Sequence, residues 1–312
     1  MRVMLVVHGF PPGASGGTEI YAHDLAMELN HQFDDEVVVL SREADPRREE
    51  HSVRWEQRNG VRVAFINNTF KTCRTFEQTY RHDGVRQATA DLMDEVQPEV
   101  VHFHHLTGLS TDLVSESRRR RTPAIFTLHD YWLICQRGQL LDRQLQRCPG
   151  PSPEGCARCV GNAAGAGPAT FHGASLLREL EGNLPLAGPL ARSLGRRMSG
   201  VWTPRSAALD QMARRAEHIQ QLCARVTRFL APSRTMLHQF VNFGVPRARI
   251  QFADLGINHA PYKDLRREAD TGPLRLGFVG SMVPSKGPHL LLEAFSRLPP
   301  GAATLQLFGS HL

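Results

Sequence analysis

Four histidines and an aspartate stand at the ends of two predicted strands. His102, His104 and His105 close one strand, and His129 and Asp130 close another. Because the carboxyl ends of parallel strands meet at one edge of a sheet, we expect these side chains to act there as acid/base groups, hydrogen-bond donors or metal ligands. Strand alternation separates His105 from the other two histidines of its strand, which does not favour a three-ligand metal centre. A structural role is the alternative for each imidazole, and it fits His129 least, since Asp130 is placed to orient it.

A glycine-containing loop follows the first predicted strand and leads into a helix. It runs from His8 to Glu19 and includes Gly16 and Gly17, whose backbone can approach a ligand closely because both lack a Cβ atom. The free N–H groups of a helix N-terminus favour an anion, so the loop predicts a phosphate site, with a structural tight turn as the alternative. The loop matches neither the G-x-G-x-x-G nor the G-x-x-x-x-G-K-S/T pattern. Thr18 is placed to cap the helix.

A second glycine loop, from Gly280 to Gly287, also joins a predicted strand to a predicted helix. It contains Ser281 and Lys286, and the chain has only two other lysines. A flexible ammonium group at the carboxyl end of a strand suits a diphosphate. The alternative for Lys286 is an ordinary surface position.

Four cysteines follow the histidine-bearing strands in a stretch rich in proline and glycine. Cys135, Cys148, Cys156 and Cys159 have the spacing C-x12-C-x7-C-x2-C. In a reducing compartment four thiolates with a terminal C-x-x-C predict a structural zinc site. Free thiols are the alternative, or two disulfides if the chain is exported.

The elements that position these residues alternate between strand and helix. This alternation predicts an α/β fold, a doubly wound Rossmann-like parallel sheet with a cysteine-containing insertion and an incomplete second Rossmann-like domain. The first domain is predicted at residues 1–255 with an irregular insertion at about 135–200, a linker at 256–272, and a first βαβ unit of a second domain at 273–312. Strands are expected at residues 3–7, 37–40, 61–66, 100–103, 124–128, 228–231, 250–253, 276–279 and 304–308. Helices are expected around residues 18–29, 85–96, 111–120, 205–225, 233–240 and 288–298.

Composition limits the classes of protein that this chain can be. Of its 312 residues, 41% are hydrophobic and 22% are charged, which excludes disorder and coiled coil. No apolar run approaches the ~20 residues of a membrane span, and none is long enough for the apolar region of a secretory signal. A cytoplasmic location is therefore expected. The net charge of +6 is carried almost entirely by arginine. The run from Arg118 to Arg121 ends a predicted helix, and without aromatic interleaving it does not predict nucleic-acid binding.

Taken together, the motifs resemble the family 4 glycosyltransferases, and the matching segments occur in the same order along the whole chain. The segments that carry the resemblance are His8-Gly9-Phe10-Pro11-Pro12 with Gly16-Gly17, Thr127-Leu128-His129-Asp130-Tyr131-Trp132, Ala231-Pro232-Ser233, and Phe278-Val279-Gly280 leading to Lys286-Gly287. The resemblance implies a GT-B architecture, in which two Rossmann-like domains bind acceptor and donor. It also implies metal-independent transfer that retains anomeric configuration.

The resemblance also implies roles for individual residues. Gly16 and Gly17 would approach the diphosphate of a nucleotide-sugar donor. His129, with Asp130 beside it, would contact the donor sugar and stabilise the transition state. Lys286 would neutralise the departing diphosphate, which is an electrostatic contribution to catalysis.

Two departures from the family pattern concern the donor side. Ser281 stands where the family often carries an arginine, although it remains a candidate donor contact. The paired-glutamate motif of the family would lie beyond residue 312. On the acceptor side, the candidates are His8, His102, His104 and Glu19.

The expected partners are a nucleotide-sugar donor and a glycan, lipid-linked or small-molecule acceptor, with peripheral contact at the inner face of a membrane compatible with the basic charge. No cofactor is expected for catalysis, and zinc is expected only in the structural cysteine site. Residues 273–312 are fewer than the ~100 of a self-standing domain, so they would form a truncated donor domain. A non-catalytic binding module is therefore the alternative function, and a zinc-stabilised nucleic-acid-binding protein is a weaker one.

Overall fold

The computed structural model describes residues 1–33, 35–161, 173, 205–259, 262–265 and 272–309. It divides into two units. The first comprises Met1–Gly138 and Gly150–Ile257, and the second comprises Gln139–Pro149 and Asn258–Leu312.

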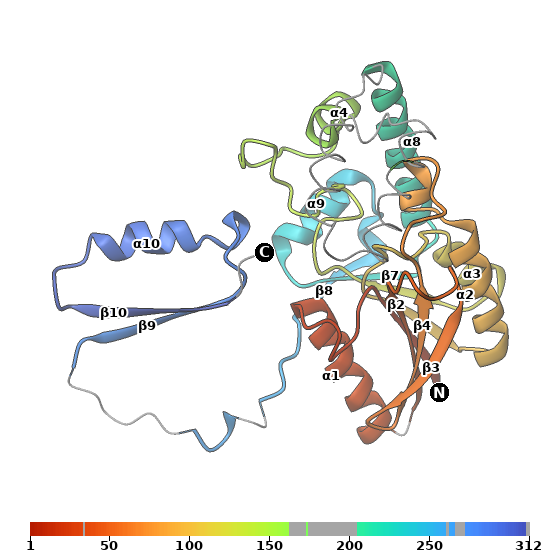
Figure 1. Cartoon of the computed structure of the whole chain (residues 1–312), viewed down its shortest axis with the longest axis horizontal. Coiled ribbons are helices and arrows are strands. Elements are labelled where there is room, and N and C mark those ends of the chain that lie inside the picture. Colours follow the sequence, from red (N-terminus) through yellow and green to blue (C-terminus); the bar gives the residue numbers. More distant parts are fainter. Residues whose placement is uncertain (34, 162–172, 174–204, 260–261, 266–271, 310–312) are drawn as a thin grey trace. The chain divides into compact units, whose positions relative to one another are not determined.

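The first unit is built on an eight-stranded sheet (Figure 1). Its strands are β1 (Arg2–Val7), β2 (Glu36–Glu43), β3 (Val53–Arg58), β4 (Val61–Asn67), β5 (Val100–Phe103), β6 (Ala124–Thr127), β7 (Arg228–Ala231) and β8 (Ile250–Phe252). They lie in the order β3-β4-β2-β1-β5-β6-β7-β8. All neighbours are parallel except β3 and β4, which form an antiparallel edge. The predicted doubly wound α/β class is confirmed.

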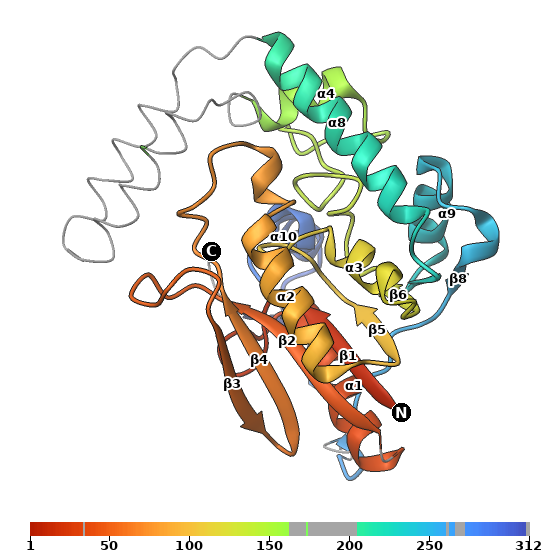
Figure 2. The same cartoon turned by 90° about the vertical axis from the view of Figure 1, so that its right-hand side faces the viewer.

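Helices cover both faces of this sheet. They are α1 (Gly17–Gln32), α2 (Asp83–Val96), α3 (Leu113–Arg119), α4 (Pro153–Val160), α8 (Arg205–Cys223) and α9 (Arg234–Phe243), with 3₁₀ turns at Glu77–Thr79 and Arg247–Arg249. Figures 1 and 2 show α1 on one face of the sheet and α2 and α3 on the other, and α4 beside α8. Burial on both faces explains why the parallel strands are nearly continuous apolar runs.

Alternation along the strands builds the core beneath α1. In β1, Leu5 and Val7 point to the same face, where Ala22 and Ala26 of α1 cover them without exposure to solvent. The small alanine side chains allow the helix to approach the sheet closely. The buried cluster on this face contains Val3, Leu5, Val7, Phe10, Ala22, Ala26, Val37, Val39, Val61, Val63 and Phe65.

The strand order changes direction at β1. From β1 the chain moves to β2 and β4 on one side, and β5 to β8 follow on the other side. In open α/β sheets, ligands bind outside the carboxyl ends of the strands at such a switch point. The carboxyl ends of β1 and β5 lead into the glycine loop and the first group of histidines.

The second unit contains a parallel βαβ element, as predicted. Its elements are β9 (Leu274–Val279), a 3₁₀ turn at Pro284–Lys286, α10 (Pro288–Ser296) and β10 (Ala303–Phe308). Apolar side chains here are exposed, including Val279 at 85% and Leu290 at 60%. The unit thus contains a strand pair and one helix whose apolar surface is largely uncovered.

The structure corrects two details of the sequence-based prediction. Strand β3 was not predicted, although every predicted strand and helix is present. Thr18 does not cap α1, because the helix begins at Gly17 with Gly16 as its N-cap, and no side chain makes a capping hydrogen bond. In the predicted insertion the structure shows α4 and an isolated bridge between Leu141 and Arg147. Residues 162–172 and 174–204 of that insertion lie outside the described residues.

Across the part of the chain that the structure describes, no helix combines the length and the apolar character that crossing a bilayer requires.

Candidate active site

Three strand ends and one helix start converge to form the candidate site. The carboxyl ends of β1, β5 and β6 carry the histidines, and the first turn of α1 carries Glu19 and Tyr21. Backbone hydrogen bonds fix the chain after β5, where the N–H groups of His104 and His105 both donate to the carbonyl oxygen of Val6.

His104 and His129 form the centre of the site. Nδ1 of His104 lies 3.1 Å from Nε2 of His129, so one of the two nitrogens donates a hydrogen bond to the other. The ring of Tyr21 packs against both imidazoles, with its centroid 5.2 Å from that of His129 and 5.7 Å from that of His104. Burial lowers the pKa of His129 to about 4, helped by the neighbouring His105. Both rings are therefore neutral near pH 7, because burial also holds the pKa of His104 well below its usual value.

His102 packs against the His104 ring of this pair. Its ring lies 4.2 Å from that of His104, as the predicted shared face requires, and its Nε2 lies 2.7 Å from Oγ1 of Thr127. Burial lowers the pKa of His102 to about 4. We infer that this neutral side chain packs beneath the site, since it is 8% exposed.

His105 and Asp130 form a second, separate pair. The backbone N–H of Thr107 donates to Nδ1 of His105 at 3.1 Å, so Nε2 carries the proton and donates to Oδ2 of Asp130 at 3.2 Å. The other carboxylate oxygen, Oδ1, accepts from the N–H of Trp132 at 2.8 Å. Burial raises the pKa of Asp130, but the His105 hydrogen bond and charge bring it below its usual value overall. The structure thus gives Asp130 the role of orienting His105, whereas His104 and Tyr21 orient His129.

Glu19 and His8 extend the second pair toward the glycine loop. Nε2 of His8 lies 3.1 Å from Oε1 of Glu19, and the His8 ring lies 4.3 Å from that of His105. The hydrogen bond from His8 lowers the pKa of the Glu19 carboxyl despite its burial. A continuous row of polar groups therefore runs from Glu19 through His8 and His105 to Asp130.

The start of α1 leaves room for a ligand at one glycine and none at the other. A Cβ atom added at Gly16 would lie 2.6 Å from Oε2 of Glu19, so this glycine allows the carboxylate to fold back over the turn. A Cβ atom at Gly17 would meet no atom within 4 Å. The N-cap residue Gly16 makes no side-chain hydrogen bond, although the Glu19 carboxylate accepts from its own backbone N–H in the first turn.

Comparison with known families assigns this region. Residues 15–149 match the model of Glycosyltransferase Family 4. Over these residues the chain is similar to glycosyltransferase family 4. The match includes the first turn of α1 and both histidine-bearing strand ends, so the resemblance inferred from the sequence is confirmed over the candidate site.

Solved structures share the fold of this chain at low identity. The Alr3699/HepE protein of Anabaena, crystallised with UDP and glucose, aligns with a TM-score of 0.52 at 12% identity, covering 100% of this chain and 62% of its own. Sucrose-phosphate synthase from Thermosynechococcus elongatus aligns at 0.54 and 14%, covering 99% of this chain and 62% of its own. Trehalose-6-phosphate synthase OtsA aligns at 0.52 and 12%, covering 100% and 66%. These similarities confirm a GT-B-like fold, and the chain spans about two thirds or less of their length.

A search of curated proteins finds no match to the chain.

Ser281 and Lys286, the donor-side candidates of the second loop, lie in the second unit. Ser281 follows β9, and Lys286 ends the 3₁₀ turn that precedes α10. Gly287 follows with φ of +73°, a left-handed conformation that favours glycine between the turn and the helix. The predicted placement of this loop between a strand and a helix is confirmed.

The predicted zinc site is not supported. All four cysteines lie within the described residues, and no group of three or more metal-ligating side chains occurs there. Cys156 and Cys159 lie on α4, Cys135 lies in the turn after β6, and Cys148 belongs to the second unit. The C-x-x-C pair is therefore part of a helix, and none of the four forms a disulfide.

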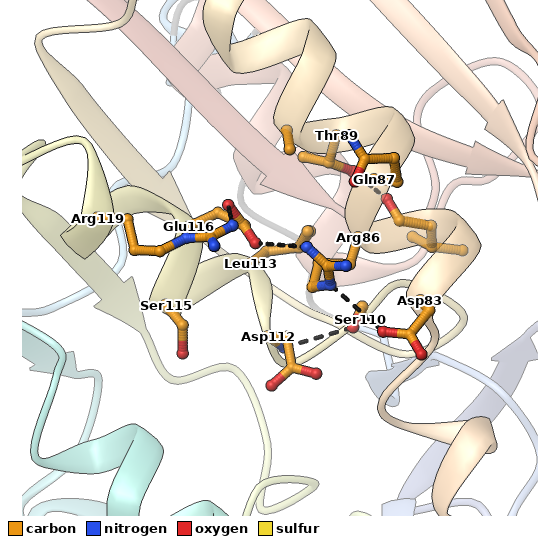
Figure 3. A network of polar contacts seen from close by, with 12 residues as sticks. Asp83, Arg86, Gln87, Thr89, Ser110, Asp112, Leu113, Ser115, Glu116 and Arg119 are labelled. Carbon is orange, nitrogen blue, oxygen red and sulfur yellow. Dashed lines mark hydrogen bonds and ion pairs between the residues drawn. The ribbon is translucent and has the colours of Figure 1, made fainter.

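The arginine run at the end of α3 makes ion pairs within the protein. Glu116, whose side chain is 2% exposed, accepts from Arg86 at 3.0 Å and from Arg119 (Figure 3). It also accepts from Arg120 at 2.9 Å. Arg120 also pairs with Asp94 on α2 at 2.7 Å. These contacts join α2 to α3, which supports the interpretation of the run as a structural helix end.

Proposed function

We propose that the chain is a retaining GT-B glycosyltransferase, or the acceptor-side part of one. The reaction is transfer of a sugar from a nucleotide-diphosphate donor to a glycan, lipid-linked or small-molecule acceptor. The match of residues 15–149 to the family 4 model supports this class, and the HepE structure with UDP and glucose supports a uridine nucleotide as the first donor to test. In this proposal residues 1–255 bind the acceptor, and residues 273–312 begin the donor-binding domain.

The observation that carries the proposal is the position of His129. The neutral imidazole of His129 lies at the carboxyl end of β6, in contact with Tyr21. Tyr21 lies on α1, one turn after the start of the helix at Gly17. A neutral ring can donate a hydrogen bond to a sugar hydroxyl without adding positive charge beside the sugar, which itself becomes positive as the bond to the diphosphate breaks. This matches the role that the family resemblance implies for His129.

Donor contacts are proposed for each glycine loop separately. N–H groups at Gly16 and Gly17 would hold the diphosphate at the helix start. Lys286 and Ser281 would contribute an ammonium and a hydroxyl from the second unit. As the bond between the anomeric carbon and the diphosphate oxygen breaks, negative charge grows on the diphosphate, and these donors stabilise it.

The acceptor side is proposed from the row of polar groups described above. His8, His102, His104 and Glu19 are the candidates, and the geometry separates their roles. His8, whose side chain is 28% exposed, lies at the loop within reach of an acceptor hydroxyl and contacts the buried Glu19, whereas His102 is buried beneath His104. Asp130 is ionised near pH 7 and holds His105, so we propose that it acts on the transition state by shaping the site around the sugar.

The test is release of nucleoside diphosphate from a panel of UDP-, ADP- and GDP-sugars. It should be run on the 312-residue chain and on a version that continues through a complete second domain, with product anomers identified by NMR. Turnover with retained configuration supports the proposal. Thermal stabilisation by UDP without turnover in either version would favour the non-catalytic binding module, and neither binding nor turnover would contradict both.

A further inference from the structure

An arginine occupies a core position of α8. The buried side chains of this helix recur at the spacing of one helical face, and five of them are apolar. The sixth is Arg215, which is 5% exposed and stands where the pattern predicts a leucine or methionine. The apolar members of the stripe are Ala208, Met212, Ile219, Leu222 and Cys223.

The Arg215 guanidinium binds the turn that follows the proposed catalytic strand end. Its Nη2 donates to the carbonyl oxygen of Trp132 at 2.7 Å, and its Nη1 donates to that of Leu133 at 3.1 Å. The planar group also lies between two rings, with Cζ 5.3 Å from the centroid of Trp132 and 5.5 Å from that of Tyr80. No carboxylate of the described residues forms an ion pair with Arg215, and its Nε has no hydrogen-bond partner there.

Placing a guanidinium group at a core position has a large unfavourable desolvation free energy. A buried charge without a carboxylate partner loses its hydration and regains only part of it from carbonyl dipoles. Burial accordingly lowers the pKa of Arg215 to about 10. An apolar side chain would pack the same stripe of α8 at less cost, so the contacts of the guanidinium need an explanation beyond packing.

Trp132 connects Arg215 to the candidate site. Its backbone N–H donates to Oδ1 of Asp130 at 2.8 Å, and its indole ring lies 5.4 Å from the ring of His105. His105 in turn donates to the other oxygen of Asp130. Arg215 therefore contacts both the carbonyl oxygen and the ring of Trp132. The same residue, Trp132, donates its N–H to Asp130 and packs its ring on His105.

We propose that Arg215 is a positioning residue: it fixes the Trp132 turn and, through it, the geometry of the Asp130–His105 pair. The inference rests on the proposed transferase function, because Asp130 and His105 matter for turnover only if that site acts on a sugar donor. The planar fork is required as well as the charge, since two carbonyl oxygens and two ring faces are engaged at once.

The experiment compares Arg215→Lys and Arg215→Met with a matched control on the same helix. Arg214 is the control, since it is exposed and its one ion pair among the described residues is with Asp210 one turn away, so Arg214→Met removes a neighbouring arginine without touching the turn. Steady-state kinetics with the preferred donor should show kcat lowered about 10- to 100-fold in Arg215→Lys, with donor KM within about threefold, because misplacement of catalytic groups acts on turnover. Arg214→Met should retain the wild-type values.

A double mutant separates positioning from general stability. If Arg215 acts through Asp130, Arg215→Lys should cost little further kcat in an Asp130→Asn background. If the two losses multiply, or if Arg215→Lys keeps kcat within threefold of Arg214→Met, the proposal is wrong. The lysine variant keeps the charge, so it covers the case in which Arg215→Met does not fold.

A second readout is independent of activity. In protein labelled with ¹⁵N-histidine, the ring nitrogens of His105 report its hydrogen bonds, and Arg215→Lys should shift them while Arg214→Met should not. Absence of turnover in the wild type with a shifted His105 would contradict the proposed function and support the positioning role. Turnover with an unshifted His105 would contradict the positioning role alone.

Discussion

Nδ1 of His104 and Nε2 of His129 lie 3.1 Å apart, in a hydrogen bond between two buried imidazoles. Two positively charged rings could not share this contact, and burial already lowers the pKa of His129 to about 4. The contact therefore excludes two charged rings, and burial keeps both histidines neutral near pH 7. This neutrality links the chemistry of the site to its stability.

The first prediction concerns acid stability. For His102, whose pKa is about 4 when folded against an ordinary value of 6.5, the unfolded chain binds more protons between these two pH values. The contribution of neutral His102 to the free energy of unfolding should therefore be at its maximum above pH 6.5. It should decline as the pH falls from 6.5 toward 4. The slope should be up to about 1.4 kcal/mol per pH unit for each such group, and His104 and His129 behave alike.

Urea denaturation at pH 7, 6 and 5 measures this slope. His102→Gln should reduce the pH slope of the free energy of unfolding by the contribution of one histidine. His238→Gln, on the exposed surface of α9, should leave the slope unchanged. Equal slopes in the wild type and His102→Gln would show that His102 is not a neutral buried group.

The second prediction distinguishes the two glycines of the α1 start. Gly17→Ala places a methyl group where the protein has no atom within 4 Å, so the melting temperature should stay the same or rise slightly. If the diphosphate occupies that space, the donor KM should increase about tenfold or more. Gly16→Ala is the contrasting variant, since its Cβ would displace the Glu19 carboxylate and disturb the protein even without ligand. An unchanged donor KM in Gly17→Ala would exclude the diphosphate from this position.

The third prediction concerns the ion-pair cluster between α2 and α3. Glu116→Gln leaves three arginines without a buried anionic partner, so it should lower the free energy of unfolding by about 1–3 kcal/mol. Asp94→Asn removes an exposed partner of Arg120 and should cost less than about 1 kcal/mol. Denaturant melts give both values, and kcat should be unaffected in either variant. A large loss of kcat in Glu116→Gln at intact stability would assign the cluster a role in turnover.

The fourth prediction concerns metal content. Because the cysteines are not gathered into a ligating group within the described residues, protein purified under reducing conditions should contain less than about half an equivalent of zinc. Cys156→Ser should then leave the melting temperature unchanged in the presence or absence of a chelator. One equivalent of zinc, released by that substitution, would restore the zinc site predicted from the sequence.

The sheet could be predicted because its determinants are local. Short β-branched runs such as residues 3–7 and 100–103 are buried on both faces, and the helices between them repeat their apolar residues at helical spacing. Strand β3 was missed because its residues, such as Arg54 and Glu56, are polar and lie at an antiparallel edge. None of its residues is fully buried, and its packing on β4 includes Arg54 stacking over Phe65, which no periodicity signals.

The sequence predicted which residues meet at the site, but it did not predict their hydrogen-bond partners. Strand ends placed His104, His129 and Asp130 together, but sequence adjacency suggested that Asp130 orients His129, whereas it binds His105. Pairings between strands depend on register and on side-chain rotamers, which one sequence does not specify. Arg215 was missed for a related reason, since its partner turn lies more than 80 residues away in the chain.

The most direct test of the whole account is the turnover number of His129→Ala against that of His238→Ala. Both should be measured by nucleoside diphosphate release in the version with a complete second domain. We expect kcat to fall at least about 100-fold in His129→Ala and to stay within twofold of wild type in His238→Ala, because only His129 lies at the proposed donor sugar. A His129→Ala protein that folds normally and transfers sugar at the wild-type rate would contradict the proposed function of this site.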